Sequence, residues 1–160
     1  MSRQTPGIET PRGIRNNNPG NIRHSKVCWV GEADDQPDPD FVTFIAPEYG
    51  IRAICRILLA YQADDGCRTI RQLIRRWAPP SENDTDAYVA AVSRACGLGP
   101  DDLACVRQAS VMTPMAEAII RQETGEQPYP SPLIAKALAL AGIGPTPRPS
   151  VPNPTQAAPA

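Results

Sequence analysis

The stretch EYGIRAICRILLAYQ, residues 48–62, decides the fold class of this chain. Its apolar side chains recur at positions i, i+3, i+4, i+7 and i+8, and they are Ile51, Ile54, Cys55, Leu58 and Leu59. Arg52 and Arg56 fall on another face, so the pattern predicts an amphipathic helix over about residues 48–62.

The sequence after this stretch predicts further helices. Apolar residues on one stripe indicate a helix over about residues 69–77, with Trp77 expected in the core and Pro79 stopping the chain from continuing as a helix. Asp84 or Thr85 is expected to cap a helix that reaches about Ala95.

Proline near the start and glycine after the end mark three more predicted helices. Pro100 with residues 101–102 opens a short one, and Thr113-Pro114 opens one that ends at Gly125. Ser131-Pro132 opens the last, which ends at Gly142.

The sequence before residue 48 has a different character. Residues 12–45 combine turn-forming segments with short β-like runs, at residues 12–15, 27–30 and 41–45. These runs predict a small, irregular β-hairpin region. The expected fold class is therefore mainly α with a small β-hairpin region (α+β).

Composition at the two ends sets the limits of the folded part. Residues 1–11 are polar with two prolines, and residues 143–160 hold six prolines with little that is apolar. Both ends are predicted to be flexible, and the Pro-rich tail to be disordered. One folded domain is expected over residues 12–142.

The overall charge excludes some partner classes. The chain has 16 Lys and Arg against 17 Asp and Glu, a net charge of -1, which gives no indication of nucleic-acid binding. No segment reaches the roughly 18 apolar residues of a membrane span, and the N-terminus lacks the apolar stretch of a signal peptide. The five cysteines lack CxxC spacing and are expected mainly as small core residues.

One carboxylate has a position suited to acid catalysis. Glu123 follows an apolar run, residues 118–120, and precedes Gly125. In the last turn of a helix the negative end of the dipole disfavours an ionised carboxylate, whereas a general acid must carry a proton. The segment from Glu123 to Pro128 resembles the helix that bears the catalytic glutamate in lytic transglycosylases and goose-type lysozymes.

A second segment resembles the groove half of autolysin-type glucosaminidases and related phage wall hydrolases. It comprises Asn17-Asn18-Pro19-Gly20-Asn21-Ile22, then Trp29-x-Gly31, then Phe41-Val42-Thr43-Phe44 and the following helix. In those enzymes the paired asparagines lie after the glutamate helix, whereas here they lie before it. The resemblance thus implies a lysozyme-like domain whose glutamate helix has moved to the back, as in a circular permutation.

A third segment, RWAPPSENDTDAY at residues 76–88, completes the likeness. It is similar to a group of phage and prophage proteins that share the run RGIRNNNPGNI found here at residues 12–22. The likeness covers about residues 12–142. It implies a lysozyme-like, virion- or lysis-associated protein, although many members of that group are regarded only as structural.

The resemblance suggests which residues hold a sugar. The amides of Asn17, Asn18 and Asn21 offer donors and acceptors for N-acetyl and hydroxyl groups, or else form a plain Asx-rich turn. Aromatic rings that could pack on sugar rings, or belong to the core, are Trp29, Tyr88 and Tyr129.

A second catalytic carboxylate is less certain from the sequence. Hydrolysis needs one, whereas a lytic transglycosylase uses a single acid and a hydroxyl of the substrate. Asp38, Asp40 and Glu48 are the candidates, with Glu48 equally suited to a structural place in a first helical turn. His24 is the single histidine, so we expect no metal and no cofactor.

The leading hypothesis is therefore a peptidoglycan-cleaving enzyme, a muramidase-type hydrolase or lytic transglycosylase with Glu123 as the general acid; glucosaminidase bond choice stays open. The alternative is a non-catalytic virion structural or cell-wall-binding protein, and a peptidase is a weaker third. The expected partners are bacterial peptidoglycan and a phage particle or secretion-system components. The protein would be made in the cytoplasm and act in the periplasm, at the cell wall or in a virion.

Overall fold

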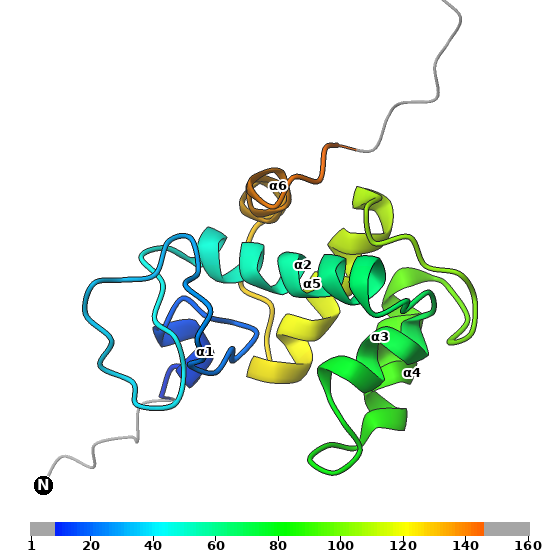
Figure 1. The fold of residues 1–160 in the computed structure, drawn as a ribbon, viewed down its shortest axis with the longest axis horizontal. Coiled ribbons are helices and arrows are strands. Elements are labelled where there is room, and N and C mark those ends of the chain that lie inside the picture. The colour runs from blue at the N-terminus through cyan, green and yellow to red at the C-terminus, as the bar shows by residue number, and fades with distance from the viewer. Residues whose placement is uncertain (1–8, 146–160) are drawn as a thin grey trace, which may run out of the picture.

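The structure, a computed structural model, describes residues 9–145, and within this range the fold is mainly helical as predicted (Figure 1). Its helices are α1 (Arg12–Arg15), α2 (Pro47–Asp64), α3 (Ile70–Trp77), α4 (Thr85–Cys96), α5 (Ala109–Thr124) and α6 (Ser131–Leu140). Of the predicted flexible ends, all but residues 9–11 and 143–145 lie outside the described part.

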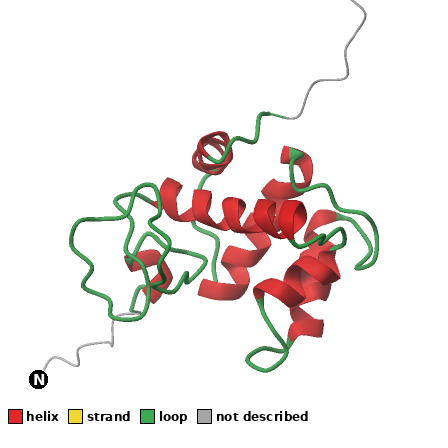
Figure 2. Cartoon of the chain, in the orientation of Figure 1, coloured by secondary structure: helices red, strands yellow, loops and turns green. Residues whose placement is uncertain are grey.

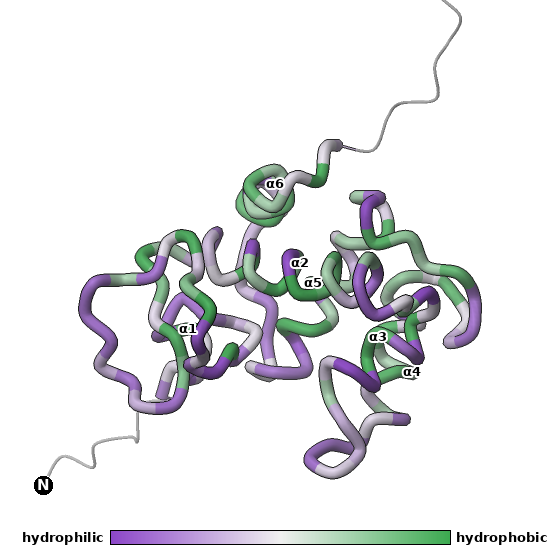
Figure 3. Tube along the Cα trace, in the orientation of Figure 1, coloured by the Kyte–Doolittle hydropathy of each residue, from purple (hydrophilic) through white to green (hydrophobic). Residues whose placement is uncertain are grey.

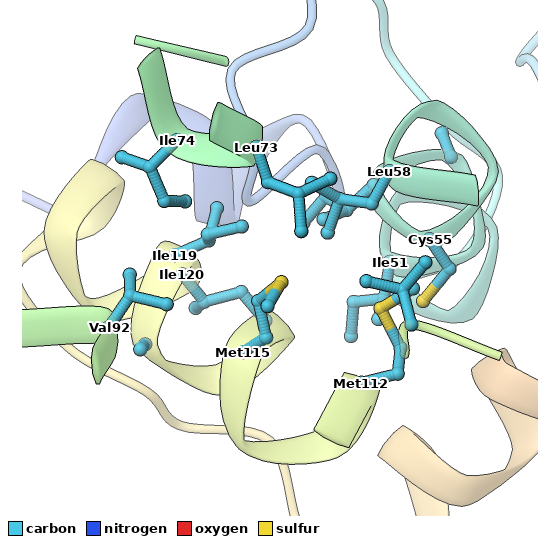
Figure 4. Packing of buried hydrophobic residues seen from close by; sticks show 14 of the residues in the cluster. Ile51, Cys55, Leu58, Leu73, Ile74, Val92, Met112, Met115, Ile119 and Ile120 are labelled. Atoms are coloured by element: carbon cyan, nitrogen blue, oxygen red, sulfur yellow. The ribbon is translucent and has the colours of Figure 1, made fainter. Parts of the chain in front are cut away.

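Helix α2 runs through the middle of the molecule, as its sequence pattern predicts. Helix α6 packs along one side of it, and α3 and α5 pack on other sides. Figure 4 shows Ile51, Cys55 and Leu58 of α2 facing Leu73 of α3 and Met112, Met115 and Ile119 of α5. All of these side chains are fully buried, so three helices share one apolar core.

Several helix ends form as the sequence predicts. Thr69 and Gln72 form a reciprocal capping box at the start of α3, and the Asp84 side chain accepts a hydrogen bond from the Ala87 amide at the start of α4. Gly125, with φ 82°, ends α5 in the left-handed conformation.

Two predictions based on proline were wrong. Helix α5 begins at Ala109 and contains Pro114, because Ser110, whose carbonyl loses its helical partner, is exposed to water while Met112 and Met115 are buried. No helix forms at residues 100–102, where the Pro100 carbonyl accepts a hydrogen bond from the Arg71 amide in the first turn of α3.

The predicted hairpin region is barely present. Residues 12–15 form the short helix α1, and residues 16–46 form loops without a named strand (Figure 2). Only two isolated antiparallel bridges occur there, Arg23 with Phe41 and Glu32 with Phe44. The outward loop of residues 33–40 is largely hydrophilic (Figure 3), so it has no apolar face to pair into a sheet.

Side-chain amides replace the missing strand pairing. The Asn18 side chain is fully buried; its Nδ2 donates to the carbonyls of Ile22, at 2.9 Å, and Val42, at 2.8 Å, and its Oδ1 accepts from the Ile22 amide. Asn17 donates to the Phe44 carbonyl at 3.0 Å. Asparagine therefore satisfies part of the backbone here, beside isolated backbone hydrogen bonds such as that from the Val42 amide to the Ile22 carbonyl.

The loop region lies directly against α2 because Gly50 has no side chain. A Cβ atom added at Gly50 would lie 1.9 Å from the Asn17 carbonyl oxygen. On another face of α2, Arg52 and Arg56 donate to the carbonyls of Leu140 and Ala141, each at 3.2 Å. The loop region and the end of α6 are therefore both fastened to α2.

Two smaller findings concern the cysteines and the helix lengths. The five cysteines are free: Cys55 and Cys67 are buried as expected and Cys96 is half-buried, whereas Cys28 and Cys105 are exposed. Within residues 9–145 none of the helices has the length and apolar character needed to cross a membrane.

We expect Asn18→Ala to lower the free energy of unfolding by about 3 kcal/mol, because it leaves the Val42 carbonyl and the buried Ile22 amide without a partner and removes one of the two hydrogen bonds to the Ile22 carbonyl. Urea denaturation followed by circular dichroism measures this change. The matched control is Asn83→Ala, since Asn83 is exposed and makes one hydrogen bond of 3.4 Å; it should change stability by less than about 0.5 kcal/mol. Equal stability of the two variants would contradict this account of Asn18.

Candidate functional site

Glu123 lies at the centre of the candidate site, in the last turn of α5. Its side chain is half-buried and lines an open cleft with a volume of about 620 Å³. The side chains and backbone around this cleft come from three parts of the chain: Gly20, Asn21, Ile22, Arg23 and Phe41 of the loop region, Ile57 and Tyr61 of α2, and Trp77, Ala78, Glu82 and Asn83 at and after the end of α3.

Three donors bind the Glu123 carboxyl group. The Trp77 indole Nε1 and the Tyr88 hydroxyl donate to Oε1, at 3.2 and 3.0 Å. The Asn21 amide Nδ2 donates to Oε2 at 3.3 Å and equally to the main-chain carbonyl of Glu123. Oε1 thus accepts two hydrogen bonds. Oε2 accepts one long hydrogen bond, from an Asn21 amide group that also donates to the main-chain carbonyl of Glu123.

Local structure places each donor. Asn21 adopts φ 48°, a left-handed conformation that asparagine tolerates. Its main-chain amide donates to the main-chain carbonyl of Asn18. Trp77 is the last residue of α3, and Tyr88 lies in the first turn of α4. The intervening loop is held by Thr85, whose hydroxyl donates to the Ala78 carbonyl at 2.6 Å. The two aromatic donors are thereby brought to the same oxygen.

Tyr88 is buried, and this environment keeps its hydroxyl protonated. Burial raises the pKa of Tyr88 well above its ordinary value, and the nearby charge of Glu123 and the hydrogen bond to it raise this pKa further. The hydroxyl therefore remains available as a donor to Glu123 across the physiological pH range.

The structure brings Asn21, Tyr88 and Glu123 together but not the other predicted ligand residues. The amides of Asn17 and Asn18 are used within the loop region, and Asn18 has no exposed surface. Trp29 and Tyr129 are half-buried against the core and do not line the cleft. Burial raises the pKa of Tyr129 to about 12.

The three other predicted catalytic carboxylates lie elsewhere. Asp38 accepts hydrogen bonds from Arg12 and Asn16 and does not line the cleft. Asp40 accepts a hydrogen bond from Arg12 at 3.0 Å, and Glu48 lies 3.5 Å from Lys136 of α6. Neither residue lines the cleft. Within residues 9–145 no group of three or more His, Cys, Asp or Glu side chains is arranged to hold a metal ion.

Sequence reasoning missed three residues of the site. Trp77 was expected in the core, and it does pack against it, but its indole nitrogen reaches Glu123. Trp77 belongs to the shared segment of residues 76–88, which could have indicated a place in the site. The helical periodicity of residues 69–77 instead led to the prediction of a core residue. Glu82 lies in the same shared segment and Arg23 directly follows the run of residues 12–22, but neither was singled out, because their place in the cleft depends on tertiary structure.

Fold and site together define a mainly helical protein with a glutamate-centred cleft, in which asparagine, tryptophan and tyrosine hold the carboxyl group. No protein-family model matches the chain. Over 124 residues the chain is 37% identical to Protein P5 of Pseudoalteromonas phage PM2, and the aligned part covers 76% of each chain. The chain belongs to the same family as this phage protein, so the expectation of a bacteriophage relative is confirmed.

The raised pKa of Tyr88 predicts an alkaline loss of stability. The folded state holds the proton of the Tyr88 hydroxyl more tightly than the unfolded state does. The protonated hydroxyl therefore contributes fully to the free energy of unfolding below pH 10, and this contribution is lost as the pH rises above the ordinary tyrosine pKa of about 10. Above that pH the free energy of unfolding of the wild type should fall by about 1.4 kcal/mol per pH unit more than that of Tyr88→Phe. Denaturant titrations at several pH values measure the difference, and parallel curves would refute it.

Proposed function

We propose that this protein cleaves the glycan strands of peptidoglycan in a lysozyme-like domain, with Glu123 as the general acid. The observation that carries the proposal is the position of Glu123 in an open cleft, held by Asn21, Trp77 and Tyr88. Each of the three segments that resemble wall hydrolases supplies one or more of these residues, although the segments are distant in sequence.

The two carboxyl oxygens have different roles in this proposal. Oε1 accepts from Trp77 and Tyr88, and the indole can only donate, so Oε1 is the anchored oxygen. Oε2, with one hydrogen bond of 3.3 Å, is the oxygen that would carry the proton and donate it to the bridging glycosidic oxygen. The three donors then stabilise the carboxylate that this transfer leaves behind.

Attack on the sugar can follow two routes. In a lytic transglycosylase a hydroxyl of the substrate attacks and yields a 1,6-anhydro end, whereas in a hydrolase water attacks and yields a reducing end. Glu82 is the other carboxylate that lines the cleft, so it replaces Asp40 and Glu48 as the candidate for activating water. Muramidase and glucosaminidase cleavage differ in which sugar carries the new end.

One place in the fold is suited to the change in segment order that the resemblance implies. Residues 9–11, which lead into the asparagine segment, line a small cavity together with residues 124–126 at the end of the glutamate helix. A direct connection at this place would give the order of glutamate helix and asparagine segment that is typical of glucosaminidases.

The similarity to a phage protein favours a second candidate function, a non-catalytic component of a phage particle that binds the cell wall. In that case the cleft would hold glycan, and Glu123 would serve as a hydrogen-bond acceptor. The two candidates differ in one respect, since only the enzyme releases soluble fragments.

The decisive experiment uses purified sacculi digested by the wild type, Glu123→Gln and Glu126→Gln. We expect Glu123→Gln to lower the release of soluble fragments by about 100-fold or more, because the amide has no acidic proton to donate. Mass spectrometry of the product ends then distinguishes hydrolysis from transglycosylation. Glu126 is an exposed glutamate three residues away, so Glu126→Gln should retain full release.

Two outcomes would decide against the enzyme. Undiminished release by a folded Glu123→Gln variant would exclude Glu123 as the acid. If the wild type releases no fragments but sediments with sacculi, the non-catalytic candidate is favoured.

Tyr88 should act as a positioning residue. It does not line the cleft, so Tyr88→Phe should lower kcat about 10-fold by loosening the carboxyl group while leaving KM unchanged. The matched control is Tyr129→Phe, because the buried Tyr129 hydroxyl has no hydrogen-bond partner within the described residues. A rise in KM, or an equal loss in the control, would contradict this role.

A further inference from the structure

Two arginines lie over the ring of Phe41 at the edge of the cleft. The guanidinium carbon of Arg12 lies 4.6 Å from the ring centroid, and that of Arg23 lies 5.2 Å from it. A guanidinium on an aromatic face is held in place by the ring while the N–H groups at its edge remain free to bind.

The two arginines differ in their partners. Arg12 donates to Asp38 at 2.6 Å and to Asp40 at 3.0 Å, and these hydrogen bonds raise the pKa of Arg12 and lower that of Asp38. Among residues 9–145 no carboxylate lies within 4.0 Å of the Arg23 guanidinium. The charge of Arg12 is therefore neutralised locally, and that of Arg23 is not.

The backbone around Arg23 is fixed. The Val42 amide donates to the Ile22 carbonyl and the His24 amide donates to the Asp40 carbonyl, each at about 3 Å, so both neighbours of Arg23 are tied to the segment that contains Phe41. Arg23 lines the same cleft as Glu123, together with Phe41 and Asn21. A stacked cation without a carboxylate partner thus stands on the wall of the candidate active site.

We infer that Arg23 binds a carboxylate of the substrate and makes the cleft selective for acidic glycans over neutral ones. This inference rests on the proposed function, and it names the substrate class within it. A planar guanidinium can bind both oxygens of a carboxylate through two parallel hydrogen bonds. Neutral glycans such as chitin offer no carboxylate to pair with it.

Peptidoglycan has two sources of such a carboxylate. Stem peptides carry free carboxyl groups, and glycan strands stripped of their peptides expose the carboxyl of the lactyl ether. Glu82 and Glu123 are the carboxylates that line the cleft, and neither comes within 4.0 Å of the Arg23 guanidinium. A bound acidic substrate would therefore pair with a cation that is still available.

The test is isothermal titration calorimetry in the Glu123→Gln background, which removes turnover from the measurement. The ligands are soluble glycan oligomers with stem peptides, the same oligomers after removal of the peptides, and chitin oligomers. Addition of Arg23→Gln should raise the Kd for a carboxylate-bearing ligand about tenfold and leave the Kd for chitin oligomers within about twofold. The ligand that loses affinity identifies the source of the carboxylate.

Two further variants serve as controls. Arg23→Lys keeps the charge but not the planar donors, so it should recover only part of the affinity. Lys26→Gln removes an exposed cation of the same loop that does not line the cleft, and it should change none of the three affinities.

Other outcomes would overturn the inference. An equal loss of affinity for all three ligands would assign Arg23 a structural role, and an unchanged Kd for every ligand, or no binding of any of them, would exclude Arg23 as the determinant. Failure of the proposed function is recognised separately, because it requires that wild-type protein releases no fragments from sacculi, whereas the calorimetry needs no cleavage.

Discussion

The surroundings of Glu123 depend on an amide that does not touch it. The buried side chain of Asn18 binds three backbone groups at residues 22 and 42, and so closes a region that has no sheet of its own. Because Gly50 allows this region to lie directly on α2, the turn at residues 18–21 is brought to the end of α5. Without that closure Asn21 would have no fixed place beside the carboxyl group.

The helical part of the fold was predictable. Burial of one helix face gives apolar residues a helical spacing, and the unpaired backbone groups at helix ends favour capping residues, proline and glycine there. Predictions failed where a residue's effect depended on its surroundings. Pro114 lies inside α5, since Ser110, whose carbonyl loses its helical partner, is exposed to water. Residues 100–102 do not form a helix, and the Pro100 carbonyl instead accepts a hydrogen bond from the Arg71 amide in the first turn of α3. The hairpin was overestimated because the backbone hydrogen bonds between its segments stay isolated, and asparagine side chains bind other backbone groups that a continuous ladder would pair.

Only those residues of the candidate site that lie in a recognisable sequence segment could be predicted. Glu123, Asn21 and Tyr88 lie in the three segments from which the resemblances were drawn, and the structure brings them within hydrogen-bond distance. Asn18 has the same chemistry as Asn21, and only the backbone groups around it make it structural. Arg23 and Glu82 lie in or beside shared segments, but the segments do not show that the two residues line one cleft. They do so in the folded chain, where the cleft is formed by the loop region, α2 and the end of α3.

Helix α2 also gives the molecule two functionally different sides. Ile57 and Tyr61 contribute to the cleft wall, while Arg52 and Arg56, on another face, hold the end of α6. Figure 1 shows that the described chain departs after α6 on the side of α2 opposite the end of α5, where Glu123 lies. A surface that gripped the protein there would leave the cleft facing outward, so one molecule can be immobilised on a large assembly and still present its groove to a polymer.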